Sequence, residues 1–497
     1  MKKNGVFLLA VLVIAISVAG CGPKDGEVLS ESEWEKYLIE DNYKRDLLDI
    51  KTPNEYEIDI EFDPAQKKYT GKQTVKYINN EDVSLNEVYF HIHPNAFRET
   101  GTTPYSTESY IGGFNPGSIN FTEVLVNGEV VDYSILGDDS TLLKIPMETA
   151  LNPEQAVEIN MDYEVVLPNA EERFGYGDTT FQVGNGYPIA AVYDGSKWNT
   201  DLYYSLGDPF YSDVSNYRVT ITAPKDYIIA CSGKILSEEV DGENKVWITE
   251  AEQMRDFAWA ASQDFVIQEE IVDGVLIKNY LLPNKALVNK QAAELAYDAV
   301  EVYNTIFGEY PYEVLSVVTA DATGMEYPGL VFVWKSNQVN DESLESTIIH
   351  EVAHQWWYAA VGNNQIKEPW LDESFAIYAQ KLFYDEVKGE TEGEQYYERI
   401  VSNYKDRIGD SDKAGPILTP TYMLEDWEVY TGLLHKGAMF LHELEEELGK
   451  DKFYELLNTY YNRFKFSIAT TRDFIEVCEE VSGREYGADV DKWFFNK

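Results

Sequence analysis

Cysteine is scarce in this chain, with three cysteines among 497 residues. So few cysteines exclude a disulfide-stabilised scaffold and the cysteine-rich type of structural zinc site. Cys21 ends an amino-terminal apolar segment, so Cys231 and Cys478 remain for the folded part. Nothing in the sequence places these two close together, and both pairing and two free buried thiols stay open.

Basic residues are also few, with 40 lysines and arginines against 87 aspartates and glutamates and a formal net charge of -47. Such a surface repels nucleic-acid phosphates and anionic lipid headgroups, so no nucleic-acid partner is expected. The acidity does not identify a substrate, because it is compatible with solubility, a saline habitat or a weak preference for cationic peptides.

Long apolar runs are missing except at the amino terminus, where residues from Val6 to Ala19 follow Lys2 and Lys3. This run is too short to cross a bilayer comfortably and ends in small residues, which is typical of a secretion signal. We therefore interpret residues 1–20 as a signal peptide and expect the body of the protein outside the cytoplasmic membrane.

The end of this segment, VAGC with Cys21 as its last residue, resembles a bacterial lipobox. The resemblance implies that Cys21 is lipidated and becomes the amino terminus of a lipoprotein held at the cell membrane. Residues 21–50 are then expected to hold the lipid anchor, a polar spacer and a short helix capped by Ser30 or Ser32. The alternative is an ordinary cleaved signal followed by an incidental cysteine.

From about residue 51, apolar residues alternate with polar ones, as at Tyr56, Ile58, Ile60 and Phe62. This period of two predicts half-buried strands. Glycine and proline recur at turn-like intervals, and no long helical period appears before about residue 285. The sequence therefore predicts an all-β amino-terminal domain over residues 51–268.

The pattern then changes. Apolar residues from Leu287 to Ile306 keep helical spacing and stop at Gly308, and strands are expected at 314–319 and 330–334. Further helices are expected over Glu373 to Val387 and near 432–448, 451–463 and 471–482. Residues 269–497 are thus predicted to form an α+β domain, with no long helical domain after it.

The strongest chemical signal is HEVAH at residues 350–354. In a helix His350 and His354 lie on one face, so both imidazoles can reach one metal ion. Glu351, turned about 100° away, is placed to hold the metal's water and to act as general base on it. Eighteen residues after the motif, the glutamate of WLDESFA, Glu373, supplies a third ligand from a second helix. The fourth position stays open, which is typical of catalytic zinc.

The same motif can also occur in a zinc site that does not catalyse. A structural zinc site is disfavoured here, because such sites are closed, four-ligand and often rich in cysteine. A degenerate relative would bind the metal without catalysis, and the intact Glu351 argues against it. We therefore expect one catalytic Zn²⁺ per chain.

HEVAH, WLDESFA and the preceding Gly324-Met325-Glu326-Tyr327 together resemble the zinc aminopeptidases that include alanyl aminopeptidase and leukotriene hydrolase. The resemblance covers most of residues 50–497 and implies a thermolysin-like catalytic domain. It also implies that Glu326 binds the free α-ammonium of a peptide, while Gly324 and Met325 line an edge strand against the peptide backbone. Tyr327 stands where the family has asparagine, which affects only fine positioning.

The resemblance is weakest at the tyrosine that stabilises the tetrahedral oxyanion. Relatives carry it three residues before the glycine of a YxKG motif, but here Leu434 occupies that position before Gly437. Tyr430, four residues earlier, is the candidate. In a helix that runs through both positions it would lie on the same face but about 6 Å further along the axis, a large displacement for catalysis. A helix that starts near Gly432 would instead leave Tyr430 in a flexible lead-in that can reach the zinc. The alternative is a packed aromatic at 430, with His435 or another tyrosine acting instead.

Three further polar residues have no assigned chemistry. His91 and His93 share one face of a predicted strand and are interpreted as packed or exposed strand histidines rather than metal ligands. Asp372 stands where relatives have asparagine, next to the ligand Glu373, and its contact is not readable from the sequence.

The expected function is that of a lipid-anchored zinc aminopeptidase acting on peptides. A thermolysin-like endopeptidase with an open cleft is the first alternative. A noncatalytic binding protein that keeps the fold is the second.

Overall fold

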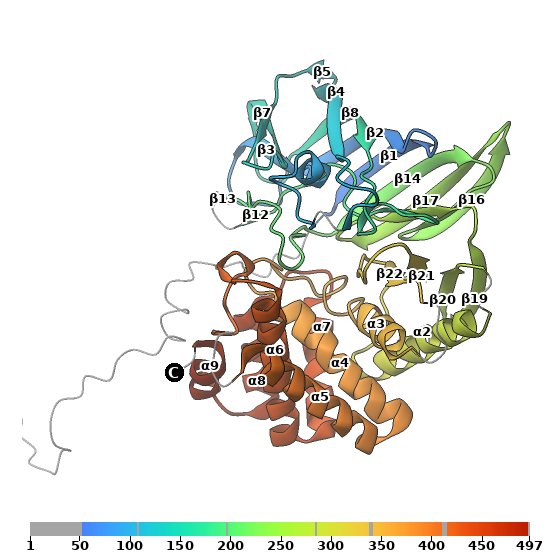
Figure 1. Cartoon of the computed structure of the whole chain (residues 1–497). Helices are drawn as coiled ribbons and strands as arrows, with labels where there is room; N and C mark the ends of the chain where they lie inside the picture. Colours follow the sequence, from blue (N-terminus) through green and yellow to red (C-terminus); the bar gives the residue numbers. More distant parts are fainter. Residues whose placement is uncertain are drawn as a thin grey trace, which may run out of the picture.

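The computed structural model describes residues 52–106, 109–194, 197–283, 286–336, 341–409 and 415–495. The predicted signal peptide, Cys21 and the helix capped by Ser30 or Ser32 lie outside the described residues. None of the described helices is long and apolar enough to cross a membrane. Two hydrophobic cores organise the chain, one built mainly by strands and one mainly by helices, and Figure 1 shows these two parts lying against each other.

The first part contains the predicted alternation. In β1 (Asn54–Asp63) the residues alternate between buried and exposed, with Tyr56, Ile58, Ile60 and Phe62 facing the core. β1 belongs to an eight-stranded sheet of order β16-β17-β14-β1-β2-β8-β4-β5, in which it pairs with β14 in parallel and with β2 in antiparallel register. The other strands of this sheet are β2 (Lys68–Ile78), β4 (Ser118–Val126), β5 (Glu129–Val130), β8 (Ala156–Val166), β14 (Ser215–Pro224), β16 (Lys234–Asp241) and β17 (Asn244–Met254).

Smaller sheets complete this part. Their orders are β15-β18-β10-β9, β11-β3-β7-β6 and β12-β13. The strands are β3 (Leu85–His91), β6 (Ser134–Leu136), β7 (Leu142–Leu151), β9 (Phe174–Tyr176), β10 (Phe181–Val183), β11 (Ile189–Ala190), β12 (Tyr193–Asp194), β13 (Lys197–Trp198), β15 (Ile228–Cys231) and β18 (Trp259–Ser262). A short 3₁₀ helix, η1 (His93–Phe97), follows β3, and no α-helix occurs among the described residues before 284. The predicted all-β class of this part is confirmed.

The second part begins with a four-stranded sheet, β19-β20-β21-β22, made of β19 (Val266–Val272), β20 (Val275–Leu281), β21 (Val314–Ala320) and β22 (Leu330–Trp334). β19 begins at Val266, just before the boundary expected after residue 268, and pairs along its length with β20. The change of sheet therefore falls between β18 and β19.

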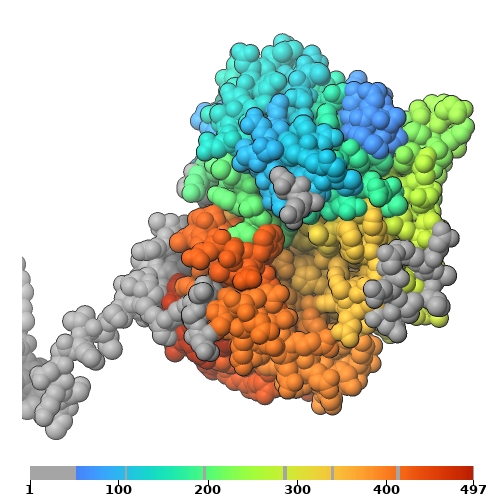
Figure 2. Space-filling model, in the orientation of Figure 1, coloured from blue at the N-terminus to red at the C-terminus, as the bar shows by residue number. Residues whose placement is uncertain are grey.

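This sheet lies between the two cores. Val317 and Val331 belong to the helical core, whereas their neighbours Val318 and Phe332 belong to the core of the β-rich part. Successive residues of a strand point to opposite faces, so strands buried on both faces are apolar throughout. The edge strand β22 contributes to both cores through Val331 and Phe332, so this edge of the sheet lies where the two parts meet. In Figure 2 the two parts contact each other along a continuous seam.

Helices form the rest of the second part. They are α2 (Ala286–Ile306), α3 (Glu342–Ala353), α4 (Trp370–Lys388), α5 (Glu390–Ile408), η3 (Thr421–Met423), α6 (Trp427–Leu448), α7 (Lys450–Phe464), α8 (Thr471–Ser482) and α9 (Gly487–Phe495). The predicted helices and strands are confirmed, and with them the α+β class. α5 was not expected, because only Gly393, Ile400 and Ile408 of its nineteen residues are fully buried and most of the others are polar or charged.

The two remaining cysteines are both free and buried. Cys231 lies in the core of the β-rich part and Cys478 in the helical core. The question that the sequence left open is thereby answered in favour of two separate thiols.

Arg255 joins the two parts. It is buried, and its Nε donates to the carbonyl of Tyr358 at 2.8 Å while its Nη2 donates to that of Ala360 at 3.1 Å. Its Nη1 donates to the carbonyl of Ser212 in the β-rich part at 3.1 Å. This side chain fixes the loop after α3 against the β-rich part.

Candidate active site

Helix α3 places the two histidines of HEVAH. Asp341 caps its amino terminus by accepting from the backbone N–H of Ser343 and Leu344 at 3.0 and 3.4 Å, and the helix runs through His350 to end at Ala353. His354 is the C-cap residue and keeps helical dihedral angles. As expected for residues one turn apart, the Nε2 atoms of the two histidines lie 3.1 Å from each other.

Glu373, in the first turn of α4, faces these two rings. Its Oε2 lies 3.3 Å from Nε2 of His350 and 3.9 Å from Nε2 of His354. Zinc bonds of about 2.0–2.2 Å in a tetrahedron place ligand atoms about 3.3–3.6 Å apart, close to the separations of these three donors, so the three donors fit a zinc ion. Burial acts to raise the pKa of Glu373, but the hydrogen bond and charge of His350 outweigh it and lower the pKa to about 2.

Asp372 has the contact that the sequence could not show. Its Oδ1 lies 2.6 Å from Nδ1 of His354, and the carbonyl oxygen of Trp357 lies 3.1 Å from the same nitrogen. Both acceptors favour the tautomer with its proton on Nδ1, which leaves Nε2 available to a metal. The side-chain amide of Gln365 donates to Asp372 and fixes this carboxylate in turn.

Glu351 points into the same space. It is buried, and its Oε2 has no hydrogen-bond partner among the described residues. Burial raises its pKa to about 7, although the charges of His350 and His354 act in the opposite direction. A buried, unpartnered carboxylate oxygen is rare in folded proteins and here is available to a water molecule beside the metal donors.

The segment Gly324-Met325-Glu326 forms the edge of the sheet. Met325 pairs with Phe332 of β22, its N–H donating at 3.1 Å and its carbonyl accepting at 2.8 Å. Because neighbouring residues of a strand direct their backbone groups to opposite sides, Gly324 presents its own backbone to the open side. The carboxylate of Glu326 is buried, and Gln365 donates to its Oε1 at 3.4 Å. Burial first, and then the charge of Asp208, raise the pKa of Glu326 well above its usual range.

Tyr327, the departure from the family pattern, packs between the two parts. Its side chain is fully buried, with the ring 5.6 Å from that of Phe332 and 6.4 Å from that of Phe210. It does not line the cavity described next.

A cavity of about 550 Å³ joins these groups, with walls supplied by both parts of the chain. From the second part it is lined by Thr323, Gly324, Met325, Glu326, His350, Glu351, Glu373, Trp427 and Tyr430, and from the β-rich part by Pro104, Tyr105, Ser106, Ser109, Glu172, Arg173, Tyr203, Tyr204, Ser205, Gly207 and Asp208. Every residue predicted for the folded site lines it except His354, which is buried behind His350.

Tyr430 reaches the cavity by a different route from the one expected. Helix α6 starts at Trp427, because Asp426 caps it by accepting from the N–H of Val429 at 2.9 Å. The expected start near Gly432, with Tyr430 in a flexible lead-in, is therefore wrong. Tyr430 lies within the first turns of the helix and still lines the cavity. Burial, followed by the charge of Glu373, raises its pKa well above the usual range.

The alternative donor, His435, is directed elsewhere. Its Nδ1 donates to the carbonyl of Thr431 at 2.7 Å, and its Nε2 lies 3.5 Å from the side-chain amide of Asn403. It is not among the residues that line the cavity.

Sequence reasoning missed the contribution of the β-rich part. The guanidinium of Arg173 pairs with the carboxylate of Asp208, and both side chains are about nine-tenths buried in the cavity wall. The adjacent Gly207, at φ +74°, leaves so little space that an added Cβ would lie 2.9 Å from the hydroxyl oxygen of Tyr430. These loop residues follow no motif spacing, so only the tertiary structure identifies them.

His91 and His93 form no metal site. Their rings are buried and stack with centroids 5.2 Å apart, and no third ligand joins them among the described residues. Both histidines are packed, as expected, but only His91 lies in the strand β3, whereas His93 begins η1.

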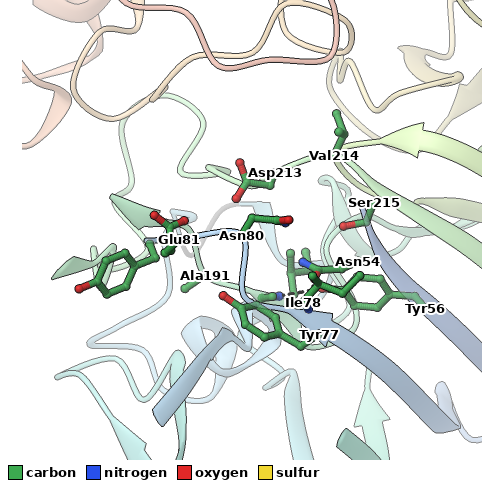
Figure 3. Close-up of a pocket in the computed structure, with 13 residues that line it drawn as sticks. Asn54, Tyr56, Tyr77, Ile78, Asn80, Glu81, Ala191, Asp213, Val214 and Ser215 are labelled. Atoms are coloured by element: carbon green, nitrogen blue, oxygen red, sulfur yellow. Dashed lines mark hydrogen bonds between the residues drawn. The ribbon is translucent and has the colours of Figure 1, made fainter. Parts of the chain in front are cut away.

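A second cavity lies in the β-rich part beside β1 and β2, where Figure 3 shows the polar side chains of Asn80, Glu81 and Asp213 around it. Its volume is about 20 Å³, which is enough for about one water molecule. It is too small for a peptide.

The comparisons with known proteins agree with this geometry. Residues 291–496 match the Peptidase family M1 domain. Aminopeptidase M1-B of Oryza sativa is 25% identical over 299 residues, which are 56% of this chain and 34% of that protein. Leucine aminopeptidase 2 of Aspergillus terreus is 24% identical over 284 residues, or 54% of this chain and 41% of that protein. The matches therefore span less than half the length of these relatives.

The fold has solved counterparts. The M1 zinc metallopeptidase of Deinococcus radiodurans superposes with a TM-score of 0.64 at 17% identity, covering 89% of this chain and 94% of that one. A variant of that enzyme bound to a Tyr-Ser-Ala substrate superposes with a TM-score of 0.63 at 16% identity and the same coverage. The family match and the donor set His350, His354 and Glu373 confirm the expectation of a zinc cofactor. Residues 291–496 thus match peptidase family M1, and this part of the chain is similar to the zinc aminopeptidases that its motifs resemble.

Proposed function

We propose that this protein is a zinc-dependent aminopeptidase that removes amino-terminal residues from peptides outside the cytoplasmic membrane. One observation carries the proposal. A single cavity is lined by the metal donors His350 and Glu373, with His354 directly behind, and by the unpartnered carboxylate of Glu351 and the buried carboxylate of Glu326 at the sheet edge. The peptide bound in the related Deinococcus enzyme supports a peptide substrate for a cavity of this fold.

Hydrolysis needs a Lewis acid and a base. His350, His354 and Glu373 would hold the zinc ion, which when bound would supply the Lewis acid that polarises a carbonyl and makes water more acidic. Glu351 lies beside these donors and takes the proton of the attacking water. It then gives that proton to the nitrogen of the departing peptide.

Glu326 restricts cleavage to the amino-terminal residue of the peptide. A free α-ammonium placed against this buried carboxylate forms a charge-assisted hydrogen bond, whereas an acetylated terminus leaves the carboxylate unsatisfied. Asp208, another carboxylate of the cavity wall, is already paired with Arg173, so Glu326 is the group available to the ammonium. Gly324 presents its backbone to the peptide along the same edge.

Tyr430 is proposed as the donor to the developing oxyanion. It lines the cavity near Glu373, and burial keeps its hydroxyl protonated. A preorganised donor of this kind stabilises charge that develops in the transition state.

The test compares amino-terminal naphthylamides with the same compounds after acetylation, each with and without a chelator. We expect hydrolysis of the free-amine compounds, loss of activity on chelation and recovery on addition of zinc. If acetylated compounds are cleaved as fast as free ones, the protein is an endopeptidase of the same family and the role of Glu326 is wrong.

We further propose that the protein is a lipoprotein anchored to the cell membrane through Cys21, on the strength of the lipobox-like segment. The expected result is that Cys21→Ser moves the protein out of the detergent phase and leaves uncleaved or misprocessed precursor. Unchanged detergent partitioning of this variant contradicts the anchor.

A further inference from the structure

The cavity is lined by five carboxylates, and four of them have a positive partner or a task in the mechanism above. Glu373 binds the metal, Glu351 is the base, Glu326 takes the substrate's ammonium, and Asp208 is paired with Arg173. The fifth carboxylate, that of Glu172, has no such task.

Hydroxyl groups hold Glu172 in place. Ser109 donates from Oγ to its Oε1 at 3.1 Å, and Thr323 donates from Oγ1 to its Oε2 at 3.4 Å. Two hydroxyls orient a carboxylate without neutralising it. Among the described residues that line the cavity, Arg173 is the only lysine or arginine, and its guanidinium is shared with Asp208 and the ring of Phe210.

The position of Glu172 along the binding edge is set by Thr323. Thr323 directly precedes Gly324, the residue that presents its backbone to the peptide, and is three residues from Glu326. Through its hydrogen bond to Thr323, Glu172 lies beside the Gly324 end of this segment rather than at Glu326, in the part of the cavity wall that would face the side chains of a bound peptide.

We infer that Glu172 is a specificity residue, which binds the positively charged side chain of an arginine or lysine at the first or second position of the peptide. This inference rests on the proposed aminopeptidase function. The carboxylate of Glu172, held in the wall by two hydroxyls, matches one additional positive charge, and the net charge of -47 attracts cationic peptides to the surface around it.

The experiment measures kcat/KM for arginine, lysine, leucine and methionine naphthylamides, which test the first position, and for the dipeptides Leu-Arg and Leu-Leu, which test the second. The variant is Glu172→Gln, which keeps the shape and one acceptor for the two hydroxyls. The matched control is Glu171→Gln, because the neighbouring Glu171 pairs with Lys335 at 3.4 Å and does not line the cavity.

Glu172→Gln is expected to lower the preference for cationic over leucine substrates by about tenfold, the effect of losing one charge-assisted hydrogen bond. The position at which this loss appears, first or second, assigns the subsite, and Glu171→Gln is expected to keep the parent's preference. If the parent hydrolyses these substrates and Glu172→Gln changes cationic and neutral ones equally, this inference alone is wrong. If the parent protein with zinc bound hydrolyses none of these substrates, the proposed aminopeptidase function is wrong, and this inference is wrong with it.

Discussion

Gly324 and Glu351 lie so close together that a side chain at position 324 would occupy the space of the Glu351 carboxylate. A Cβ atom at position 324 would lie 2.1 Å from Oε1 of Glu351 and 3.0 Å from Cγ2 of Thr347. The glycine of the edge segment therefore serves two purposes, since it presents backbone to the cavity and leaves room for the base.

Gly324→Ala is expected to displace the carboxylate and to lower kcat by about a hundredfold, within the contribution of a general base. Zinc content is expected to stay at one per chain, because the three ligands are untouched. Gly101→Ala is the matched control, since a Cβ there has nothing within 4 Å. Equal activity of both variants would show that Glu351 does not need its present position.

Variants of the metal ligands and of the general base are expected to differ in zinc content. His350→Ala, His354→Ala and Glu373→Ala each remove one of three donors and are expected to abolish tight zinc binding together with activity. Glu351→Gln is expected to keep the metal and to lose about 10² to 10⁴ in rate. Metal analysis beside turnover checks both statements, and full zinc in all three ligand variants contradicts the assignment.

Glu326→Gln keeps the size of the side chain and removes its charge. We expect a loss of about tenfold or more in kcat/KM for free-amine substrates, because the ammonium loses a charge-assisted partner. Zinc content and the slow hydrolysis of acetylated compounds are expected to stay constant. A uniform loss on both substrate types would indicate a structural defect instead.

Tyr430→Phe deletes only the hydroxyl that faces the cavity. Loss of an oxyanion donor is expected to lower turnover by about 10² to 10³ without loss of zinc. Tyr460→Phe, in the buried core of α7 away from the cavity, is the control and is expected to turn over normally. A drop of less than about threefold for Tyr430→Phe assigns the role to another group.

We expect Asp256 to make the free energy of unfolding depend on pH. It is buried in the β-rich part, and burial raises its pKa to about 7, against hydrogen bonds from Tyr187 and the backbone N–H of Phe257. Between about pH 4, its unfolded pKa, and pH 7 the folded state binds more protons than the unfolded state. Its contribution is therefore fully present below pH 4 and is lost as the pH rises to 7.

The measurement is urea unfolding of the parent and of Asp256→Asn across this range. The difference in unfolding free energy, parent minus variant, is expected to fall by up to about 1.4 kcal/mol per pH unit and then to level off. Parallel pH profiles of the two proteins would exclude a proton on the folded Asp256.

The spacing of apolar residues along the chain was sufficient to predict the helices and strands that hold the site residues. The period of two in β1 and the helical spacing of α2 and α4 follow from which side chains must be buried, and the boundaries observed lie close to those expected. α5 was missed because its helix is held by partly buried tyrosines rather than by a continuous apolar stripe. The start of α6 was misplaced because Asp426 was not recognised as its cap.

The sequence by itself determined the metal donors, since residues one helical turn apart on α3 must share a face and Glu373 completes a spacing that chance rarely produces. Only the tertiary structure decided what surrounds them. Packing of α4 against the end of α3 brings Asp372 to His354, and packing of the β-rich part against the sheet edge brings Glu172, Arg173 and Asp208 to the cavity. The contacts between the β-rich part and the second part join segments more than a hundred residues apart. They depend on how the two hydrophobic cores pack together, and the spacing of apolar residues along the chain does not predict this packing.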